Sequence, residues 1–500
     1  MFFQNKKYQA WRKKDFVWSI LHFLLHVIIL SVLVVFAIFI NLGSFQQTLN
    51  FIIDESTYFH TIYVVATVLV LALVVYLYFF FESRDFLIRA KNIAIIFIAM
   101  ELSYIICTVL GKYVGIFSRP YAICALLILL LVNKPTAVFM NFIFNIYLLI
   151  GDIFSGVDMG LIQTVGSFII GLSTSHLAVY LVDNVGSRIK VFGMGFINSL
   201  PIIALSFLFS YKAGMKVYDV LFIVLHGFIS GIGAVVAMMA ILPVFEAVFN
   251  VLTNYRLAEI TDHKSKLIRK MISDAGGTFQ HSILVATLAE TCATAIGENP
   301  LLARAAAYYH DMGKIKEPQY FTENQHGYNP HDDLTPELST QIIRAHTTNG
   351  SELIKKYHLP LILADVAQEH HGTLPIQYFY NKALKFTEGE LDIKDFSYPG
   401  PKPTSKIAAI IMLADGCEAA VRAQSDRSRE RVEKVVKAII DDRMKLDQFS
   451  DCDITMHEIR LIEEALEAGL SGVYHDRIKY PKMKDKRVNT FASSKDGKNG

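Results

Sequence analysis

The sequence predicts an all-α protein in two halves, a polytopic α-helical membrane domain of about eight spans followed by a cytoplasmic all-α domain. Up to about Asn250 the chain consists of long apolar runs, whereas from Leu252 onward it is rich in charge, histidine and helix-forming residues. In the second half apolar residues recur at helical spacing and no alternating strand pattern is found. The hydrophobic content of 53% and charged content of 19% are therefore averages over two different regions.

The membrane spans are predicted from runs of about 20 apolar residues, the length that crosses a bilayer as a helix. The first run is an anchor and not a cleavable signal peptide, because it is too long and lacks a small-residue cleavage site. Two of the spans, Tyr113–Val132 and Pro135–Ile150, form a tight pair, and the second of them is the shortest span. The expected spans are Phe16–Ile40, Thr61–Phe81, Asn92–Leu110, Tyr113–Val132, Pro135–Ile150, Met159–Val182, Val191–Phe209 and Val217–Phe249.

The distribution of positive charge predicts which side each loop faces. An even number of spans places both ends of the chain on one side of the membrane. With the N-terminus inside, the inner segments carry 11 Lys and Arg residues, and the outer loops carry only Lys112, Arg119, Lys212 and Lys216. Since cytoplasmic loops are enriched in Lys and Arg, we expect the N-terminus and the C-terminal half to be cytoplasmic, in a multi-pass membrane protein.

Several polar residues fall inside the predicted spans. Glu101, Asn141, Asn145, His176 and His226 can line a ligand cavity or a proton path, because ionisable groups in a membrane are costly unless paired or hydrated. They can equally be hydrogen-bonding groups that hold helices together. No sequence pattern links them, and the structural interpretation is favoured.

Cysteine content and net charge are less informative. The five cysteines form no CxxC pair and suit a reducing cytoplasm. The net charge of +2 sums two unlike regions. The basic stretch Lys479–Arg487 can bind acidic lipid or nucleic acid, but such runs are more often solvated tails, and no nucleic-acid polymer is expected as a partner.

The soluble half is predicted as a series of helices with two long loops. Gly297, Gly313 and Gly372 end three of the helices, and Thr278 and Thr335 are candidate N-caps. The expected helices are 258–275, 278–296, 301–312, 335–346, 361–371, 405–424 and 428–445, with loops at 317–334 and 392–404. The domain boundaries follow: N-terminus 1–15, anchor 16–40, outer loop 41–60, seven-helix membrane domain 61–250, linker helix 251–275, globular domain 276–476 and basic tail 477–500.

The chemical signal is a set of histidines and aspartates at or near predicted helix ends. Helix packing can bring such positions together around one cavity. Imidazoles mixed with carboxylates suit Fe, Mn, Zn or Co better than Ca or Mg. His326, His331 and His358 lie in loops or turns and are left out. The candidate ligands are His281, His310, Asp311, His346, His370, His371 and Asp415.

Seven ligands are too many for one ion and about right for two. Asp311, at the centre of the set, is the best candidate for a bridging ligand. Two metal ions roughly 3.5–4 Å apart can generate hydroxide from water and hold the oxygens of an in-line displacement at phosphorus. Lys314, about one turn after Asp311, can balance phosphate charge in the transition state, or it can simply complement a helix C-terminus. These residues predict a phosphoester hydrolase without specifying the substrate.

Candidate substrate contacts are harder to identify. Tyr320, Asn324, Asn329 and the loop YPGPKP (398–403) can approach the substrate, because loops over a helical scaffold often carry recognition. Asn and Pro in such loops are equally typical of turn chemistry. Arg422, on the helix after Asp415, is a candidate phosphate contact.

Several segments together resemble the seven-transmembrane HD (7TM-HD) family of membrane phosphodiesterases. They are GTFQHS, YYHDMGKIKEPQYFTENQ, NPHDDLTPELS, IIRAHTTNG, EHHGT and YPGPKP followed by AAIIMLADGCEAAVRA, and the similarity continues into the linker PVFEAVFNVLT and the membrane half. The resemblance implies hydrolysis of cyclic di-AMP to 5′-pApA at a site with two Fe or Mn ions. It implies one ion held by His281, His310, Asp311 and Asp415, and a second held by Asp311, His346, His370 and His371.

The sequence departs from this family in one respect. Family members usually carry a large extracellular domain between the anchor and the next seven spans, whereas the loop here, 41–60, has no room for one. We therefore expect any signal to enter through the membrane helices, the lipid bilayer or a partner protein. The sequence leaves the oligomeric state, including a homo-oligomer, open.

Three readings of the function remain after the resemblance. The first is a cyclic di-AMP phosphodiesterase. The second is an HD hydrolase of cyclic di-GMP or guanosine tetraphosphate. The segment HHGTLPIQYFY lacks the HHExxDGxGYP pattern of the cyclic di-GMP branch. The guanosine tetraphosphate branch usually uses a one-metal HD site, whereas the His370-His371 doublet argues for two metals. The third is a membrane receptor whose HD domain binds a nucleotide without cleaving it.

Overall fold

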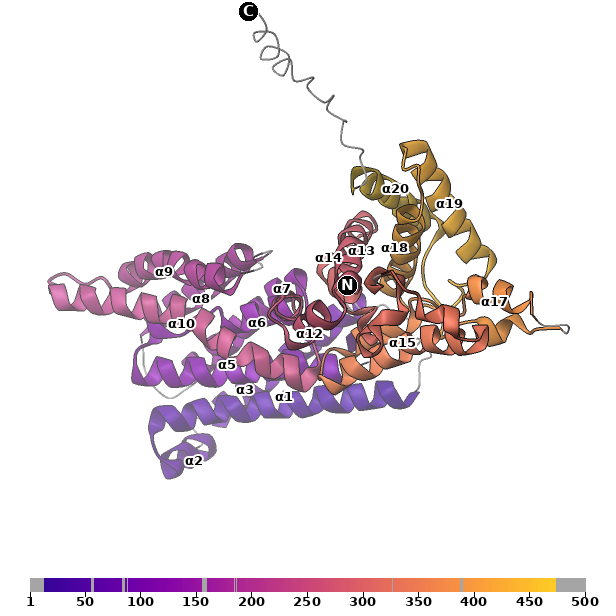
Figure 1. Cartoon of the computed structure of the whole chain (residues 1–500). Helices are drawn as coiled ribbons and strands as arrows, with labels where there is room; N and C mark the ends of the chain where they lie inside the picture. Colours follow the sequence, from indigo (N-terminus) through magenta and orange to yellow (C-terminus); the bar gives the residue numbers. More distant parts are fainter. Residues whose placement is uncertain are drawn as a thin grey trace, which may run out of the picture.

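The computed structural model describes residues 13–473, except 55–57, 83–85, 88, 155–159, 184, 186, 326 and 387–389. Within these residues the chain is helical, and its only β-type pairing is an isolated bridge between Pro375 and Ser397. The structure has two bodies, a bundle of long parallel helices and a cluster of shorter ones beside it (Figure 1). The predicted all-α fold is therefore confirmed. The predicted basic tail lies outside the described residues.

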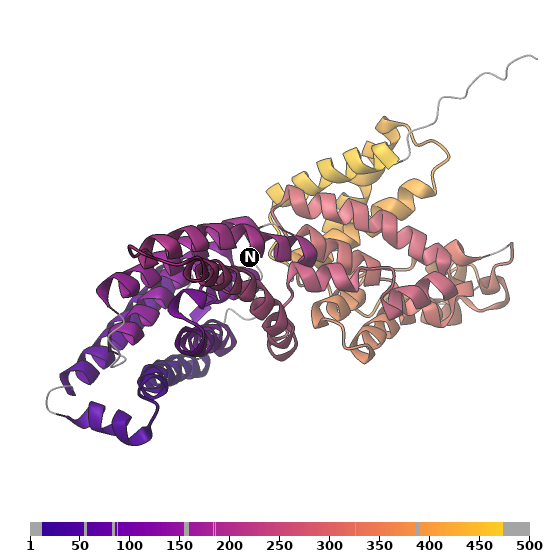
Figure 2. The ribbon, with the colours of Figure 1, turned by 90° about the vertical axis from the view of Figure 1, so that its left-hand side faces the viewer.

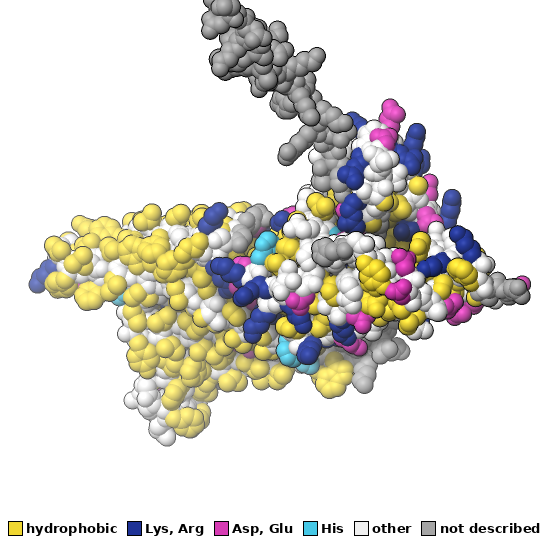
Figure 3. Space-filling model, viewed as in Figure 1, with side chains coloured by type: hydrophobic (Ala, Val, Ile, Leu, Met, Phe, Trp, Pro, Cys, Tyr) yellow, Lys and Arg dark blue, Asp and Glu magenta, His cyan; other side chains and the backbone are white. Residues whose placement is uncertain are grey.

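The first body contains seven helices that are long and apolar enough to cross a membrane. The face of the first body seen in Figure 3 is almost continuously hydrophobic, in contrast to the mixed, charged face of the second body. Exposed apolar surface of this extent is typical of a membrane interaction site. The elements are α1 Lys13–Leu42, α2 Phe45–Ile53, α3 Tyr58–Glu82, α5 Ala90–Tyr113, η2 Ile116–Ser118, α6 Ile123–Leu131, α7 Lys134–Phe154, α8 Leu161–Val182, α9 Arg188–Ser210 and α10 Val217–Phe249.

One predicted span, Tyr113–Val132, is not a continuous helix. After Gly115, at φ 148°, the chain forms the short turn η2 and then α6, whose nine residues rise only about 14 Å. Pro120 contributes to the break, because the residue before a proline disfavours helical backbone. Most residues of α6 and the non-helical residues before it are buried, so this break in the helix is covered by protein and not by lipid. The shortest predicted span, by contrast, is part of the 21-residue α7.

Arg119 was predicted in an outer loop, and it lies in the connection between α5 and α6, but it is buried and is not an exposed loop charge. Its guanidinium is buried in the bundle and donates two bonds of 2.6 Å to the carboxylate of Asp152 on α7. The backbone carbonyl of Arg119 also accepts a bond from Ser230 on α10. A loop residue therefore joins two membrane helices, because an arginine inside a membrane requires a paired counter-charge.

Several other polar groups in the bundle have side-chain partners on the same or a neighbouring helix, whereas atoms such as Asn198 Oδ1 have no hydrogen-bond partner among the described residues. His26 Nδ1 lies 2.7 Å from Glu101 Oε1, which links α1 to α5. Asn141 Nδ2 lies 2.8 Å from His176 Nδ1, which links α7 to α8, and Asn145 Nδ2 donates to Asn141 Oδ1 over 2.9 Å. These contacts fit the interpretation of the polar residues as groups that hold helices together.

Contacts at the helix ends show that α1 starts on the same side as the second body. Lys112 Nζ donates to the carbonyl of Asn41 over 3.0 Å, so α1 and α5 end together on the far side. At the near side Lys91 Nζ, at the start of α5, lies 3.4 Å from the carbonyl of Asn250, where α10 ends and the second body begins. This arrangement agrees with an even number of crossings before α11.

The second body is an all-α domain that lies against one corner of the bundle (Figure 2). The predicted linker helix is two helices separated by a turn, and α15 ends ten residues later than predicted. Its elements are α11 Asn254–Ile260, α12 Lys266–Asp274, α13 Gly276–Ala295, α14 Pro300–Tyr309, η3 Met312–Lys316, η4 Pro318–Tyr320, η5 Thr322–Asn324, η6 Pro330–Asp333, α15 Pro336–Lys356, α16 Leu361–Glu369, α17 Gln377–Ala383, η7 Ile393–Phe396, α18 Lys406–Arg422, α19 Arg429–Lys445 and α20 Met456–Val473.

Capping residues set several of these helix starts. The side chains of Asn299, Thr335 and Ser405 each accept a bond from a backbone N–H in the first turn of α14, α15 and α18. Thr278, the predicted cap of α13, lies within that helix, which starts at Gly276. Its hydroxyl instead donates to Glu323 Oε1 over 3.0 Å, so Thr278 links α13 to η5.

Candidate metal centre

The seven predicted ligands come from five helices and converge on one buried centre. His281 lies on α13, His346 on α15 and Asp415 on α18, whereas the two doublets directly follow the C-termini of α14 and α16. In Figure 1 these helices pack together in the second body. The short helices α14 and α16 therefore present His310-Asp311 and His370-His371 at one end, where the chain turns.

The ligand atoms form two separate groups. Asp311, His346, His370 and His371 offer atoms that all lie within 4.8 Å of one another, and so do His281, His310 and Asp415. Each group has the size and donor types of a site for one transition-metal ion.

Asp311 lies between the two groups and faces both. Its Oδ2 is 3.3 Å from His310 Nε2 and 3.8 Å from His281 Nε2. Its Oδ1 is 3.3 Å from His346 Nε2 and 3.6 Å from His370 Nε2. One carboxylate oxygen is thus directed at each group, which is the arrangement required of a bridging ligand.

Four of the five histidines are oriented by a bond at Nδ1, which leaves Nε2 for the centre. His310 Nδ1 lies 2.6 Å from the carbonyl of Ala307, His346 Nδ1 lies 2.5 Å from that of Ile343, and His370 Nδ1 lies 2.9 Å from that of Ala367. Each of these carbonyls is three residues earlier. Metal-binding histidines commonly donate their other ring N–H in this way.

The fourth oriented histidine, His281, uses a carboxylate in place of a carbonyl. Its Nδ1 lies 2.6 Å from Glu418 Oε2, and its Nε2 lies 2.9 Å from Asp415 Oδ1. Glu418 has no exposed surface. It was not among the predicted residues, although its position one turn after Asp415 on α18 could have indicated it.

Unsatisfied polar atoms support a metal-binding role. His310 Nε2 and Asp311 Oδ1 are buried and have no hydrogen-bond partner among the described residues. Buried polar atoms without a partner are rare and costly, and both point into the centre. These residues therefore fit divalent metal ions.

The electrostatics of the centre also suit metal binding. Burial lowers the pKa of His346 to about 3, and burial holds the pKa of His371 well below its usual value, so both imidazoles are neutral. Burial alone would raise the pKa of Asp311, but His310 and Lys314 hold it well below its usual value. Burial opposes the charge of His310 and of His281, but Asp311 raises the pKa of His310 to about 10, and Asp415 and Glu418 raise the pKa of His281. A metal ion would displace the protons of these two imidazoles, because metal ligands bind in the deprotonated form.

Lys314, a predicted catalytic residue, lies at the centre in η3. Its Nζ is 2.7 Å from Asp311 Oδ2 and 2.9 Å from Glu323 Oε1. Burial opposes its charge, but Asp311 and Glu323 raise the pKa of Lys314 above its usual value. Lys314 is therefore a buried ammonium group bound to two carboxylates. Glu323, which had not been predicted, also receives the bond from Thr278.

Two of the predicted substrate contacts are engaged in bonds that hold their loop. Asn324 accepts a bond from the Thr278 N–H over 3.2 Å and donates to the Thr278 hydroxyl over 2.8 Å, so it joins η5 to α13. Asn329 Oδ1 accepts from the His331 N–H and from Gln325, both over 3.2 Å. Asn329 therefore makes the turn contacts that Asn commonly makes in loops.

Arg422 and the YPGPKP loop contact residues of the candidate metal centre. Arg422 Nη1 is 3.6 Å from Glu418 Oε2, so it approaches the centre through that carboxylate. Tyr398, the first residue of the loop, stacks on His371 with ring centroids 4.3 Å apart and is edge-on to His346 at 6.0 Å. Tyr398 therefore forms part of the wall of the centre, as the loop prediction partly anticipated.

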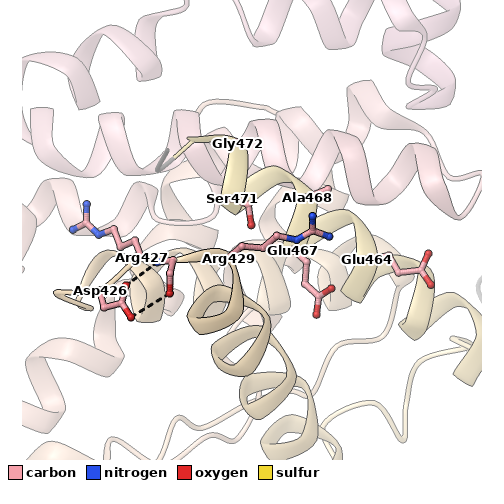
Figure 4. Close-up of a pocket in the computed structure, with 9 residues that line it drawn as sticks. Asp426, Arg427, Arg429, Glu464, Glu467, Ala468, Ser471 and Gly472 are labelled. Atoms are coloured by element: carbon pink, nitrogen blue, oxygen red, sulfur yellow. Dashed lines mark hydrogen bonds between the residues drawn. The ribbon is translucent and has the colours of Figure 1, made fainter. Parts of the chain in front are cut away.

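A separate hollow of 650 Å³ lies away from these ligands, between the start of α19 and the end of α20 (Figure 4). It is lined by residues of both charges, including Arg427, Arg429, Glu464 and Glu467. Arg429 is already paired with Glu433 over 2.9 Å. No histidine or cysteine is among its described lining residues.

Both halves of the chain match models of known protein families. Residues 58–253 match the family model described as 7TM receptor with intracellular HD hydrolase, and residues 278–420 match the model of the HD domain. The cyclic-di-AMP phosphodiesterase PgpH of Bacillus subtilis is 36% identical over 425 residues, which are 82% of this chain and 59% of that protein. The protein of the same name from Listeria monocytogenes is 45% identical over 261 residues, 52% of this chain and 36% of that protein.

A solved structure is also similar to this chain. It is the crystal structure of the Listeria monocytogenes PgpH HD domain in complex with cyclic-di-AMP, at 47% identity, with 43% of this chain and 99% of that chain covered and a TM-score of 0.41. This chain spans about three fifths of the length of the Bacillus relative. From the two family models and these relatives, the chain belongs to the family of seven-transmembrane proteins with an intracellular HD hydrolase domain.

Proposed function

We propose that this protein is a membrane-bound, metal-dependent phosphodiesterase that hydrolyses cyclic di-AMP to 5′-pApA with two divalent transition-metal ions, Mn or Fe. The observation that carries the proposal is the position of Asp311, whose two carboxylate oxygens are directed at two separate ligand groups. The substrate is supported by the names of the two PgpH relatives, which are cyclic-di-AMP phosphodiesterases.

The proposed ligand sets follow from the geometry. His281, His310 and Asp415 would hold one ion, and His346, His370 and His371 the other, with Asp311 shared between them. Two such ions supply an activated water and a positive site for the oxygens of the phosphodiester.

The residues around the ligands have roles that can be stated from their contacts. We propose that Lys314 positions Asp311 and keeps positive charge beside the reacting phosphate, because its ammonium contacts Asp311 directly. Tyr398 excludes water from one side of His371. Asn324 and Asn329 act on the substrate through the loop that they hold in place, and Arg422 acts through Glu418.

The proposed orientation places the N-terminus and the HD domain in the cytoplasm. The charge bias of the loops supports it, and removal of Arg119 from the set of outer charges strengthens that bias. The hydrophobic surface of the bundle supports insertion into the lipid bilayer (Figure 3).

The test uses the full chain purified in detergent, loaded with Mn or Fe and offered cyclic di-AMP or cyclic di-GMP. We expect cyclic di-AMP to be cleaved to 5′-pApA, and Asp311→Ala to abolish cleavage, because both ligand groups lose their shared carboxylate. The matched control is Asp441→Ala, which removes an exposed carboxylate of α19 and should retain full activity. Elemental analysis of both variants reports the number of bound ions.

Other outcomes would identify the competing functions. Cleavage of cyclic di-GMP in preference to cyclic di-AMP would assign a different substrate. Binding of cyclic di-AMP without cleavage, in protein that contains both metal ions, would support a receptor. Unchanged turnover by Asp311→Ala would show that the two-metal proposal is wrong.

A further inference from the structure

The helix α12 and the turn before it carry a concentration of positive charge. Residues 263–273 contain four Lys and Arg and no Asp or Glu. The side chains of these four cations are exposed, whereas Leu267, Ile268 and Met271 on the other side of the helix are buried in the core of the HD domain. The outward side of this segment is therefore cationic, and we call it the basic face. Its members are Lys264, Lys266, Arg269 and Lys270.

No carboxylate pairs with the basic face. In the part of the chain that the structure describes, none of its four side chains forms an ion pair or a hydrogen bond. The nearby Arg188, by contrast, is paired with Glu259 over 2.7 Å and is not counted. Asp262 and Asp274 flank the segment, and Asp262 accepts a bond of 2.8 Å from the backbone N–H of Lys264, which is a turn contact. The positive charge of the basic face is therefore available to an anionic partner.

Contacts of the preceding helix, α11, hold this segment close to the end of the membrane bundle. The Tyr255 hydroxyl of α11 donates to the carbonyl of Val185, in the connection between α8 and α9, over 2.9 Å. A tight turn then leads from α11 to α12, closed by a bond of 2.8 Å from the Ser265 N–H to the Asp262 carbonyl. Lys190, in the first turn of α9, is also exposed at this end of the bundle. The basic face therefore follows within a few residues of the point where α11 contacts the ends of two membrane spans.

The figures agree with this position. Figure 1 shows α12 between the bundle and the rest of the HD domain, and Figure 3 shows dark-blue Lys and Arg side chains gathered in this region, beside the yellow surface of the bundle. Figure 2 shows that the HD domain extends sideways beyond the outline of the bundle. A bilayer that surrounds the apolar helices therefore has its surface next to this part of the HD domain, so lipid headgroups lie within reach of the basic face.

We propose that the basic face binds anionic phospholipid headgroups of the leaflet next to the HD domain. The proposal goes beyond the enzymatic function and rests only on the insertion of the bundle into a bilayer. Clusters of four or more Lys and Arg that follow a membrane span, or lie on an amphipathic helix, are typical of binding to anionic lipid. The bundle itself holds the leaflet beside the basic face, which favours lipid over a soluble anion that has to be recruited.

The buried side of α12 connects the basic face to the candidate metal centre. It packs against α13, which carries His281, and against η3, which carries Lys314. Lipid bound to the basic face therefore holds a helix that contacts both of these elements. Binding fixes the position of this side of the HD domain relative to the membrane surface.

The test measures the accessibility of individual lysines in the full chain, in nanodiscs of phosphatidylcholine alone or of phosphatidylcholine mixed with phosphatidylglycerol. A water-soluble acylating reagent labels exposed lysines, and mass spectrometry of the peptides gives each labelling rate. We expect the three lysines of the basic face to be labelled about fivefold more slowly in the anionic discs, the change that corresponds to about 1 kcal/mol per cation at an anionic surface. Three exposed lysines of α19, which lies away from the bundle in Figure 1, are the internal control and should keep one rate in both discs. These controls are Lys434, Lys437 and Lys445.

Native mass spectrometry of the full chain in detergent with added phosphatidylglycerol provides a second measurement. The variant Lys264→Gln/Lys266→Gln/Arg269→Gln/Lys270→Gln should retain less of this lipid than the wild type. The matched control removes the same charge from exposed positions of α19 and should retain as much as the wild type. This control is Arg431→Gln/Lys434→Gln/Lys437→Gln/Lys445→Gln. Thermal denaturation of both variants separates lost binding from lost folding.

Three outcomes would overturn the proposal. The first is an equal labelling rate of the basic face in the two kinds of disc. The second is an equal loss of phosphatidylglycerol from both quadruple variants, which would show a diffuse charge effect and no site. The third is equally slow labelling when glycerol 3-phosphate is added to discs of phosphatidylcholine alone, which would identify a soluble phosphate ligand. Hydrolysis is not measured, so the lipid surface can fail while the phosphodiesterase proposal stands, and the reverse.

Discussion

The carboxylate of Glu418 provides a sharp test of the metal centre, because it touches a ligand without being one. Its Oε2 lies 2.6 Å from His281 Nδ1, and its side chain has no exposed surface. This bond holds the proton on Nδ1 and turns Nε2 toward Asp415 and the metal position. Glu418→Gln keeps the shape and an accepting oxygen but removes the negative charge.

The expected size of the effect follows from this geometry. Bonds to a charged group are roughly twice as strong as neutral ones. Loss of such a partner to a metal-bound histidine typically lowers metal affinity about 10–100-fold, which is about 1.4–2.8 kcal/mol. Because the Glu418 bond is short and fully buried, we expect Glu418→Gln to lie toward the upper end of this range.

The assay is a calorimetric titration of the metal-free full chain with Mn²⁺, combined with elemental analysis. Glu430→Gln, an exposed change on α19, is the matched control and should not change the affinity. Arg422→Gln should weaken binding by no more than about fivefold, because the ion pair of Arg422 with Glu418 is long, at 3.6 Å, and its side chain is 38% exposed.

Two results would refute the reasoning. If Glu418→Gln binds two ions with wild-type affinity, the His281–Glu418 bond does not prepare a metal ligand. If the metal-free variant is already unfolded at the assay temperature, Glu418 is needed for folding and its charge has no specific role at the metal. Thermal denaturation without metal distinguishes the second result from a specific loss of affinity.

Three further predictions concern packing, the membrane bundle and the metal. Gly313→Ala should lower both thermal stability and metal content, because a Cβ at that position would lie 1.9 Å from the carbonyl oxygen of His346, whereas Gly276→Ala, which meets nothing within 4 Å, should fold normally. Arg119→Gln should destabilise the detergent-solubilised protein by about 3–5 kcal/mol because it leaves the buried Asp152 without its arginine counter-charge, and the double variant with Asp152→Asn should recover part of that loss; a single variant as stable as the wild type would contradict this. Removal of metal by a chelator should lower the melting temperature, and Mn²⁺ at 100 times its dissociation constant should restore about 2.7 kcal/mol; an unchanged melting temperature would argue against a bound ion.

Some of the fold could be predicted because the signals are local. Runs of about 20 apolar residues and caps such as Thr335 and Ser405 predict helices from neighbouring positions alone. The prediction of one continuous helix at 113–132 was wrong because local signals contain no information about packing. The segment is apolar enough for a span, but Pro120 and the pairing of Arg119 with a distant aspartate break the helix, and only packing shows that the short α6 is covered by protein.

The sequence by itself determined the membrane character of the first half and predicted the chemical type of the site. The identities of the seven candidate ligands, at or near helix ends, were sufficient to predict a two-metal centre. Only the tertiary structure decided how Asp311 faces both ligand groups, that Glu418 orients His281 and that Asn324 bonds to Thr278 on α13. The ion pair of Arg188 with Glu259, which joins the two halves, likewise depends on residues far apart in the chain. The physical reason is that helix formation depends on neighbouring residues, whereas these contacts join side chains separated by tens to hundreds of positions and exist only once the helices have packed.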